Sequence, residues 1–374
     1  MTNNHKRFLP KEIIRNVLMR VPIEALITFK FVCMLWFKLI SDSGFQKAHR
    51  LRNSQSKIMI FKAQVPRKSE STRYDQFSIS CNGEGGRRVE EMQLRRDAFM
   101  DDNVELVACC DDLLLFERLN RISQLYIGDP YTRRCTMLPP LNSNYFCHWT
   151  LIQDVYTKKY KVVGISFIYD RCFMLTLENN LKAKNPWREM YTQLMPAVDV
   201  TSGTLVFAYG KIHWLSEGLH ISSLDVAREE LRVMPGPSCV RNQCLCSLSE
   251  ANSSLYVTAP STFTDQLEIW CLKYKPSGMW VKEYNINLVF LSTRPRSLIS
   301  FAHCLCTVFS TDSILGGSSD GMQVLIDHQN QLFVYDLQNR KLTLISSRGD
   351  EERLYILPFT RTISNVPLSL NWSD

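Results

Sequence analysis

The sequence of 374 residues has no long apolar run. No stretch approaches the roughly 20 uninterrupted apolar residues that a helix needs to cross a bilayer. The most apolar segment, residues 25–40, is interrupted by Lys30 and Lys38. The first residues also lack the apolar core and the small-residue cleavage site of a signal peptide. We therefore expect a protein that makes no membrane contact and stays in the cytosol, the nucleus or both.

The motifs of common catalytic and nucleotide-binding sites are missing as well. The sequence contains no Gly-x-Gly-x-x-Gly, no Walker loop, no Gly-x-Ser-x-Gly elbow and no His-Glu-x-x-His. Adjacent carboxylates such as Glu229 and Glu230 would point to opposite faces of a strand, so we interpret them as parts of solvated turns. The acidic pairs at residues 101–102 and 111–112 have the same interpretation. The sequence predicts a protein that is not an enzyme and needs no cofactor.

The 13 cysteines follow neither a disulfide nor a zinc framework. An odd number in a long chain without a secretion signal argues against structural disulfides. Cys244, Cys246, His303, Cys304 and Cys306 could converge on a metal if they lay on paired strands. No Cys-x-x-Cys knuckle supports zinc, so we favour the alternative that these cysteines pack in a β-rich core.

Positive charge is concentrated near the N-terminus. Residues 1–100 contain 19 Lys/Arg and 9 Asp/Glu, a balance of +10, and the remainder contains 25 and 28, a balance of −3. A basic segment can bind nucleic acid, an anionic membrane surface or an acidic protein. Nucleic-acid binding also requires stacking aromatic residues. The basic residues between positions 67 and 96 have only Tyr74 and Phe77 nearby, which argues against a nucleic-acid partner.

Residues 1–50 predict a small domain of three helices. Pro10 suits the first position of a helix, and the apolar residues after it recur at the spacing of one helix face. Pro22 ends this helix and begins a second, and a third carries Trp36. Three helices in about forty residues are near the lower size limit for independent stability. Because their apolar residues occupy more than one face, we expect a partner to cover part of them.

Residues 101–374 predict an all-β domain, and residues 51–100 predict a connecting segment with possible strands. Short β-rich runs recur along the second half of the chain with turn residues between them. This pattern is typical of a sandwich, a barrel or a propeller.

A degenerate repeat favours the propeller. Three segments combine an apolar strand, an aspartate that opens a charged turn and a second strand; the aspartates are Asp129, Asp225 and Asp336. Trp187 and Trp280 form a second matching pair, each just after a turn. The intervals of 96, 111 and 93 residues are each close to two blades of about 40–50 residues. We therefore predict a propeller of about six blades.

The helical segment resembles the F-box. Its Leu-Pro-x-Glu-Ile-Ile, Val-Leu-x-Arg-Val-Pro and Phe-Lys-x-Val-Cys-x-x-Trp elements follow that motif in order and spacing over some forty residues. Met34 stands where the motif usually has a basic residue, and Ser43 stands where proline often follows aspartate. The resemblance implies that the residues binding an adaptor are Leu9, Pro10, Ile13, Ile14, Val17, Leu18, Pro22, Leu26, Phe29, Val32, Cys33 and Trp36.

Residues 104–345 resemble the F-box-associated domain of the large plant F-box family. The similar segments are 160–163, 203–215, 225 with 234–235, and 269–270, whereas Asp111-Asp112 depart from the family's Asn-Gly type of turn. The resemblance implies a kelch-like propeller and a non-catalytic substrate receptor of an SCF (Skp–cullin–F-box) ubiquitin ligase. The partners it implies are a Skp-family adaptor, a cullin–RING scaffold reached through that adaptor, and an unknown protein target.

Two alternatives remain open at this point. The chain could be an F-box protein that binds the adaptor but delivers no target, or a propeller enzyme or carbohydrate-binding module. The second alternative leaves the F-box pattern unexplained. Residues 1–57 contain 11 Lys/Arg and 3 Asp/Glu, and this charge would speed the encounter with the acidic adaptor that the resemblance implies.

Overall fold

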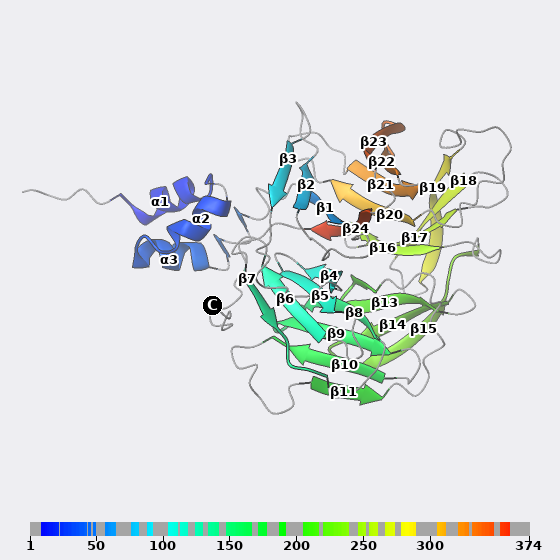
Figure 1. Ribbon diagram of the computed structural model, residues 1–374, viewed down its shortest axis with the longest axis horizontal. Coiled ribbons are helices and arrows are strands. Elements are labelled where there is room, and N and C mark those ends of the chain that lie inside the picture. The colour runs from blue at the N-terminus through cyan, green and yellow to red at the C-terminus, as the bar shows by residue number, and fades with distance from the viewer. Residues whose placement is uncertain are drawn as a thin grey trace, which may run out of the picture.

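A computed structural model places a small helical domain beside a ring of β-sheets (Figure 1). It describes residues 9–21, 23–42, 44–45, 48–49, 57–64, 76–81, 88–92, 104–110, 113–118, 124–129, 134–141, 147–166, 171–177, 187–191, 205–216, 220–238, 246–251, 254–260, 266–273, 278–288, 305–311, 321–328, 331–347 and 352–359. The predicted order of a helical module followed by a β-propeller is confirmed.

The helical domain contains α1 (Lys11–Leu18), α2 (Ile23–Phe29) and α3 (Met34–Ser41). Pro10 precedes α1 with an extended backbone, and its carbonyl accepts the N–H groups of Ile13 and Ile14 at 3.1 and 3.2 Å. Cys33 precedes α3 with an extended β-type backbone. In the part of the chain that the structure describes, no helix has both the length and the apolar character needed to cross a membrane.

A compact core holds the three helices together. Its fully buried side chains are Leu18, Leu26, Ile40 and Phe45. Phe29 and Trp36 pack against this core, with their rings 5.1 Å apart. Each fully buried side chain of this size contributes about 1.5–3 kcal/mol. The domain therefore has an interior of its own before any partner binds.

The described strands form six four-stranded antiparallel sheets, numbered here in chain order. Sheet 1 contains β4 (Val104–Cys110), β5 (Leu113–Arg118), β6 (Gln124–Asp129) and β7 (Arg134–Met137). Sheet 2 contains β8 (His148–Gln153), β9 (Tyr160–Ser166), β10 (Arg171–Thr176) and β11 (Trp187–Tyr191), and sheet 3 contains β12 (Val206–Ala208), β13 (Lys211–Ser216), β14 (His220–Asp225) and β15 (Glu230–Pro235). Sheet 4 contains β16 (Ser247–Ala251), β17 (Ser254–Pro260), β18 (Gln266–Lys273) and β19 (Met279–Asn287), and sheet 5 contains β20 (Leu305–Thr311), β21 (Gly321–His328), β22 (Gln331–Asp336) and β23 (Lys341–Ser347). Sheet 6 contains β24 (Glu352–Phe359), β1 (Lys57–Gln64), β2 (Gln76–Cys81) and β3 (Arg88–Met92).

Sheet 6 closes the ring by joining the two ends of the chain. β24 pairs with β1 in antiparallel register from Lys57 opposite Phe359 to Gln64 opposite Glu352. Residues 51–100, predicted as a connecting segment with possible strands, contain three strands of this sheet. β1 pairs on one side with the next strand, β2, but nothing local marks its pairing with β24, which lies far away in the sequence. In the closed ring the first strands of neighbouring sheets lie close to one another, so their edges are protected from edge-to-edge association.

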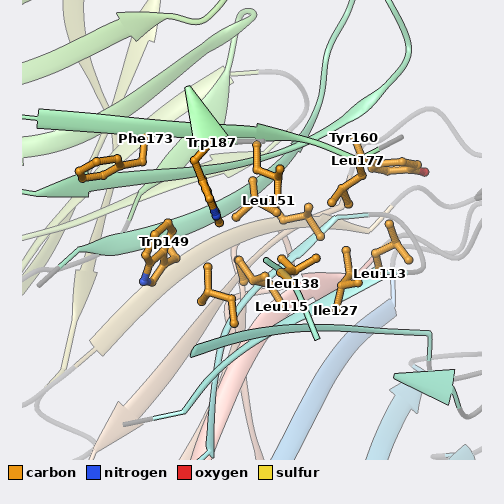
Figure 2. Close-up of a cluster of buried hydrophobic side chains, with 14 of the residues drawn as sticks. Leu113, Leu115, Ile127, Leu138, Trp149, Leu151, Tyr160, Phe173, Leu177 and Trp187 are labelled. Atoms are coloured by element: carbon orange, nitrogen blue, oxygen red, sulfur yellow. The ribbon is translucent and has the colours of Figure 1, made fainter. Parts of the chain in front are cut away.

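Apolar clusters between consecutive sheets hold the ring together. Among the described residues, one cluster joins each pair from sheets 1 and 2 to sheets 4 and 5. Figure 2 shows the cluster between sheets 1 and 2, where Trp149, Phe173 and Trp187 lie on one side of a group of aliphatic side chains. Trp149 packs directly on the backbone of Gly164 in the neighbouring strand.

The tryptophans of the sequence repeat occupy equivalent places. Trp187 in sheet 2 donates its Nε1–H to the carbonyl of Pro139 at 2.8 Å. Trp280 in sheet 4 donates to the carbonyl of Pro235 at 3.1 Å. Pro235 is the last residue of the fourth strand of sheet 3, and Pro139 lies two residues beyond the fourth strand of sheet 1. The interval between the tryptophans therefore spans two sheets, as the sequence predicted.

The aspartates of the repeat end the third strands of sheets 1, 3 and 5. In Asp225 and Asp336, one carboxylate oxygen accepts the N–H groups two and three residues further on, at 2.9 to 3.2 Å. This bonding satisfies the turn's backbone donors and explains the preference for aspartate. The turn after Asp129 lies outside the described residues.

Asp154 forms the same kind of turn between β8 and β9, which the sequence did not reveal. Its carboxylate accepts the N–H groups of Tyr156 and Thr157 at 2.8 and 3.0 Å and lies 2.6 Å from Lys161 Nζ. Burial raises the pKa of this carboxyl, but the bonds from Lys161 and the turn outweigh burial and lower the pKa to about 2. Lys158 closes the turn in a left-handed conformation with φ 57°.

The antiparallel order of strands gives the propeller two distinct faces. The connections from first to second and from third to fourth strands lie on one face, which includes residues 154–159, 226–229 and 337–340. We call this the proximal face, because the chain from the helical domain enters there at Lys57, opposite the end of β24. The remaining connections, including those between sheets, lie on the distal face.

Candidate protein-binding surface

The helical domain exposes a row of apolar side chains along α1. Ile13 and Val17 are four residues apart and lie on one side of the helix, and Leu9 precedes the first helical residue by two positions. Leu9 is 63% exposed, and the other two are about half exposed. Leu18 and Ile14 face the core instead. The helix therefore presents apolar residues both to its own domain and to solvent.

A second exposed group lies where α2 connects to α3. It comprises Phe31, Val32, Met34 and Phe37. Together with the α1 row, these account for 7 of the 13 large apolar side chains that are exposed among the described residues. Seven such side chains in a domain of about forty residues are far more than the scattered apolar residues of an ordinary surface.

The structure divides the residues that the resemblance assigned to adaptor binding. Six are exposed: Leu9, Pro10, Ile13, Val17, Val32 and Cys33. Five are buried in the core or packed against it: Ile14, Leu18, Leu26, Phe29 and Trp36. Pro22 lies outside the described residues. Leu18 and Leu26 are fully buried and can only support the exposed surface, whereas Ile14, Phe29 and Trp36 are partly exposed. The predicted set did not include the exposed Phe31, Met34 and Phe37. The only sign of them in the sequence was Met34, which stands where the motif usually has a basic residue.

Polar contacts fix the ends of this domain. Asp42, directly after α3, accepts the backbone N–H of Phe45 at 2.8 Å and forms an ion pair with Arg15 of α1 at 3.5 Å. Arg15 also lies over the Phe45 ring, 5.7 Å from its centre. His49 Nε2 donates to the carbonyl of Val21 at 3.0 Å. The exposed apolar side chains are therefore held on a fixed frame.

The propeller shows no arrangement of catalytic groups in its described part. Glu229 forms an ion pair with Arg188 at 2.7 Å, and Glu230 forms one with Arg232 at 3.3 Å, so the two carboxylates do not act as a pair. Within the described ranges, no three His, Cys, Asp or Glu side chains are close enough to hold a metal ion. Cys246 is buried between sheets 3 and 4.

The other residues of the metal alternative have no described side chain. Cys244, His303 and Cys304 lie outside the described residues. Cys306 lies on β20, but its side-chain surroundings are likewise not described.

His213 is a buried titratable side chain in the propeller. Its Nε2–H donates to the carbonyl of Ala208 at 3.0 Å, so Nδ1 accepts from the hydroxyl of Ser223 at 2.7 Å. Burial lowers its pKa to about 4, with a further contribution from Lys211. The imidazole is therefore neutral and fully bonded, which is a structural role.

These observations define a class of protein. A helical module with a complete core and an exposed apolar surface is joined to a closed β-propeller, which is the organisation of a multidomain interaction protein.

The comparisons with known proteins specify the family. Residues 8–47 match the F-box domain, and residues 58–360 match the F-box associated beta propeller domain. The chain belongs to the F-box proteins with an F-box associated propeller. Such a combination indicates an F-box substrate-recognition protein of the SCF type, and F-box proteins are generally non-catalytic subunits.

Relatives from Arabidopsis thaliana match over most of their length. F-box protein At5g49610 is 25% identical over 80% of this chain and 90% of its own. F-box/kelch-repeat protein At3g23880 is 22% identical over 88% of each chain. F-box protein At3g07870 is 23% identical over 75% of this chain and 72% of its own.

Proposed function

We propose that this chain docks through its F-box onto a Skp-type adaptor, and through it onto a cullin–RING scaffold, and presents a protein target for ubiquitylation. One observation carries the docking part. Leu9, Ile13 and Val17 form an exposed apolar row on a domain whose core is already complete and whose sequence matches the F-box. Covering such a row with a partner's apolar surface gains about 25 cal/mol per Å² removed from water.

The arrangement of the two domains supports the target-holding part. The F-box is connected at the proximal face of the propeller, so an adaptor bound there leaves the distal face available. Loops on a rigid frame are common sites of recognition. The chain itself catalyses no bond formation; it would raise the local concentration of the target near the conjugating enzyme.

Binding of the full chain to a Skp-type adaptor tests the docking. We expect Val17→Asp to reduce the affinity at least tenfold, because it places a charge in an apolar contact. Val233→Asp is the matched control, since Val233 is similarly exposed but lies on β15 of the propeller. An absence of binding by the folded wild type would refute the docking. Binding without any stimulation of ubiquitylation in cells would indicate an F-box protein that delivers no target.

The proposal includes a location in the cytosol, the nucleus or both, without membrane or nucleic-acid partners. The contacts proposed for the F-box are made with another protein and involve neither a lipid surface nor a nucleic acid. Imaging of a fluorescent fusion expressed at native level tests the location, and accumulation at a membrane would contradict it.

A further inference from the structure

The exposed group at the α2–α3 connection and the start of α3 is a separate feature of this F-box. Phe31 is 68% exposed and Met34 is 69% exposed, and Val32 and Phe37 are exposed beside them. The backbone holds this segment in place, because Phe31 N–H donates to the carbonyl of Thr28 at 3.1 Å and Val32 N–H donates to that of Phe29 at 3.2 Å. The group is therefore a fixed surface, not a loosely attached tail.

No part of the chain that the structure describes covers the group. The exposed fractions refer to the whole chain, so the propeller does not bury Phe31 or Met34. Phe29 and Trp36, which flank the segment in sequence, already contact the core. Phe31, Met34 and Phe37 could not all join that core without dismantling it. A partner outside the chain is required to remove them from water.

Continuity with the proposed docking surface identifies this partner. Val32 and Cys33 belong to the residues assigned to adaptor binding, and Phe31 and Met34 are their immediate neighbours in the chain. We propose that the adaptor-docking surface extends over Phe31, Met34 and Phe37, and that the contact there is apolar instead of ionic. This inference rests on the proposed function of the F-box.

The consequence is a selectivity among adaptors. An F-box with a lysine or arginine at position 34 can pair with an acidic side chain of its adaptor. Met34 cannot make that pair, and a carboxylate opposite it would lose water without gaining a partner. This chain therefore binds adaptors that place an apolar side chain there in preference to those that place an acidic one.

The test measures the dissociation constant of the full chain for a Skp-type adaptor by calorimetry at 0.15 and 0.5 M NaCl. We expect Phe31→Ser/Met34→Lys to weaken binding at least tenfold. The ratio of the variant's dissociation constant to that of the wild type should be the same at both salt concentrations, because salt screens ionic contacts and leaves apolar ones. Met279→Lys is the matched control, since Met279 is similarly exposed but lies on β19 of sheet 4. We expect it to bind like wild type.

Each further outcome has a defined meaning. Unchanged or tighter binding by Phe31→Ser/Met34→Lys, with Ile13→Asp still disruptive, overturns the extension but keeps the proposed function. Loss of binding by the wild type itself refutes the proposed function. A wild-type dimer in light scattering that the double variant converts to monomer, with adaptor binding unchanged, assigns the surface to a second copy and overturns the inference. Thermal unfolding of each variant confirms that it is folded, and Phe37→Ser provides an independent single substitution.

Discussion

Gly164 should tolerate no side chain, because Trp149 occupies the space that a Cβ would need. A Cβ built on Gly164 would lie 2.2, 2.5 and 2.7 Å from three ring atoms of Trp149. The ring is buried, lies 5.6 Å from that of Trp187, and donates its Nε1–H to Glu117 Oε1 at 3.0 Å. Gly164→Ala must therefore push the indole out of a filled interface and away from a buried carboxylate.

The expected cost follows from these two effects. Overpacking a filled core costs about 1–3 kcal/mol, and losing a hydrogen bond to a charged group costs about 1.5–3 kcal/mol. The better strand propensity of alanine returns about 0.5–1 kcal/mol. We expect Gly164→Ala to lower the free energy of unfolding by about 2–5 kcal/mol, measured by urea unfolding followed by far-ultraviolet circular dichroism.

A second substitution tests the mechanism. Trp149→Leu removes the colliding ring, so Gly164→Ala should cost less in that background than in the wild type, which a double-mutant cycle measures. Gly210 is the control, since a Cβ there meets no atom within 4 Å and its φ of 74° is the only obstacle. Gly210→Ala should cost about 1–2 kcal/mol. A cost below about 0.5 kcal/mol for Gly164→Ala would refute the steric argument.

Three further predictions concern the propeller. His213 has a pKa of about 4 in the folded protein and near 6.5 in the unfolded chain, so the free energy of unfolding should fall by up to about 3 kcal/mol as the pH drops from 6.5 to 4. Urea titrations at several pH values measure this dependence, and His213→Asn should flatten it. Lys158→Gly should raise the free energy of unfolding by about 0.5–1 kcal/mol, since glycine adopts φ 57° without strain; a loss of stability would mean that the lysine makes a compensating contact. Deleting residues 352–374 should leave β1 paired with β2 alone, open the ring and make the propeller sensitive to limited proteolysis, whereas deleting 361–374 should not; equal resistance would show that β24 is dispensable for closure.

The sequence predicted those parts of the fold whose cause is local. Asp225 and Asp336 could be recognised because an aspartate satisfies its own turn, and Trp187 and Trp280 because each follows a turn at a repeated interval. The pairing of β1 with β24 could not be predicted, since neither strand carries a signal of its distant partner.

The candidate site was predicted in a similarly uneven way. Spacing alone showed that the F-box helices are apolar on more than one face, but it could not tell which face forms the core. Leu18 and Ile13 look alike in the sequence, yet one is buried and the other is exposed. Only the packing of three helices around Leu26 and Phe45 decides between them.

The connection between the two domains gives the exposed F-box surface its direction. Closure by β24 fixes the start of β1 on the proximal face, and the F-box precedes β1 in the chain. A ring closed by its own C-terminal strand resists opening, so the position of β1 does not depend on whether a partner is bound. The F-box is thus attached to a rigid body at one defined point. An adaptor bound as proposed would be held on that side, away from the strand ends on the distal face.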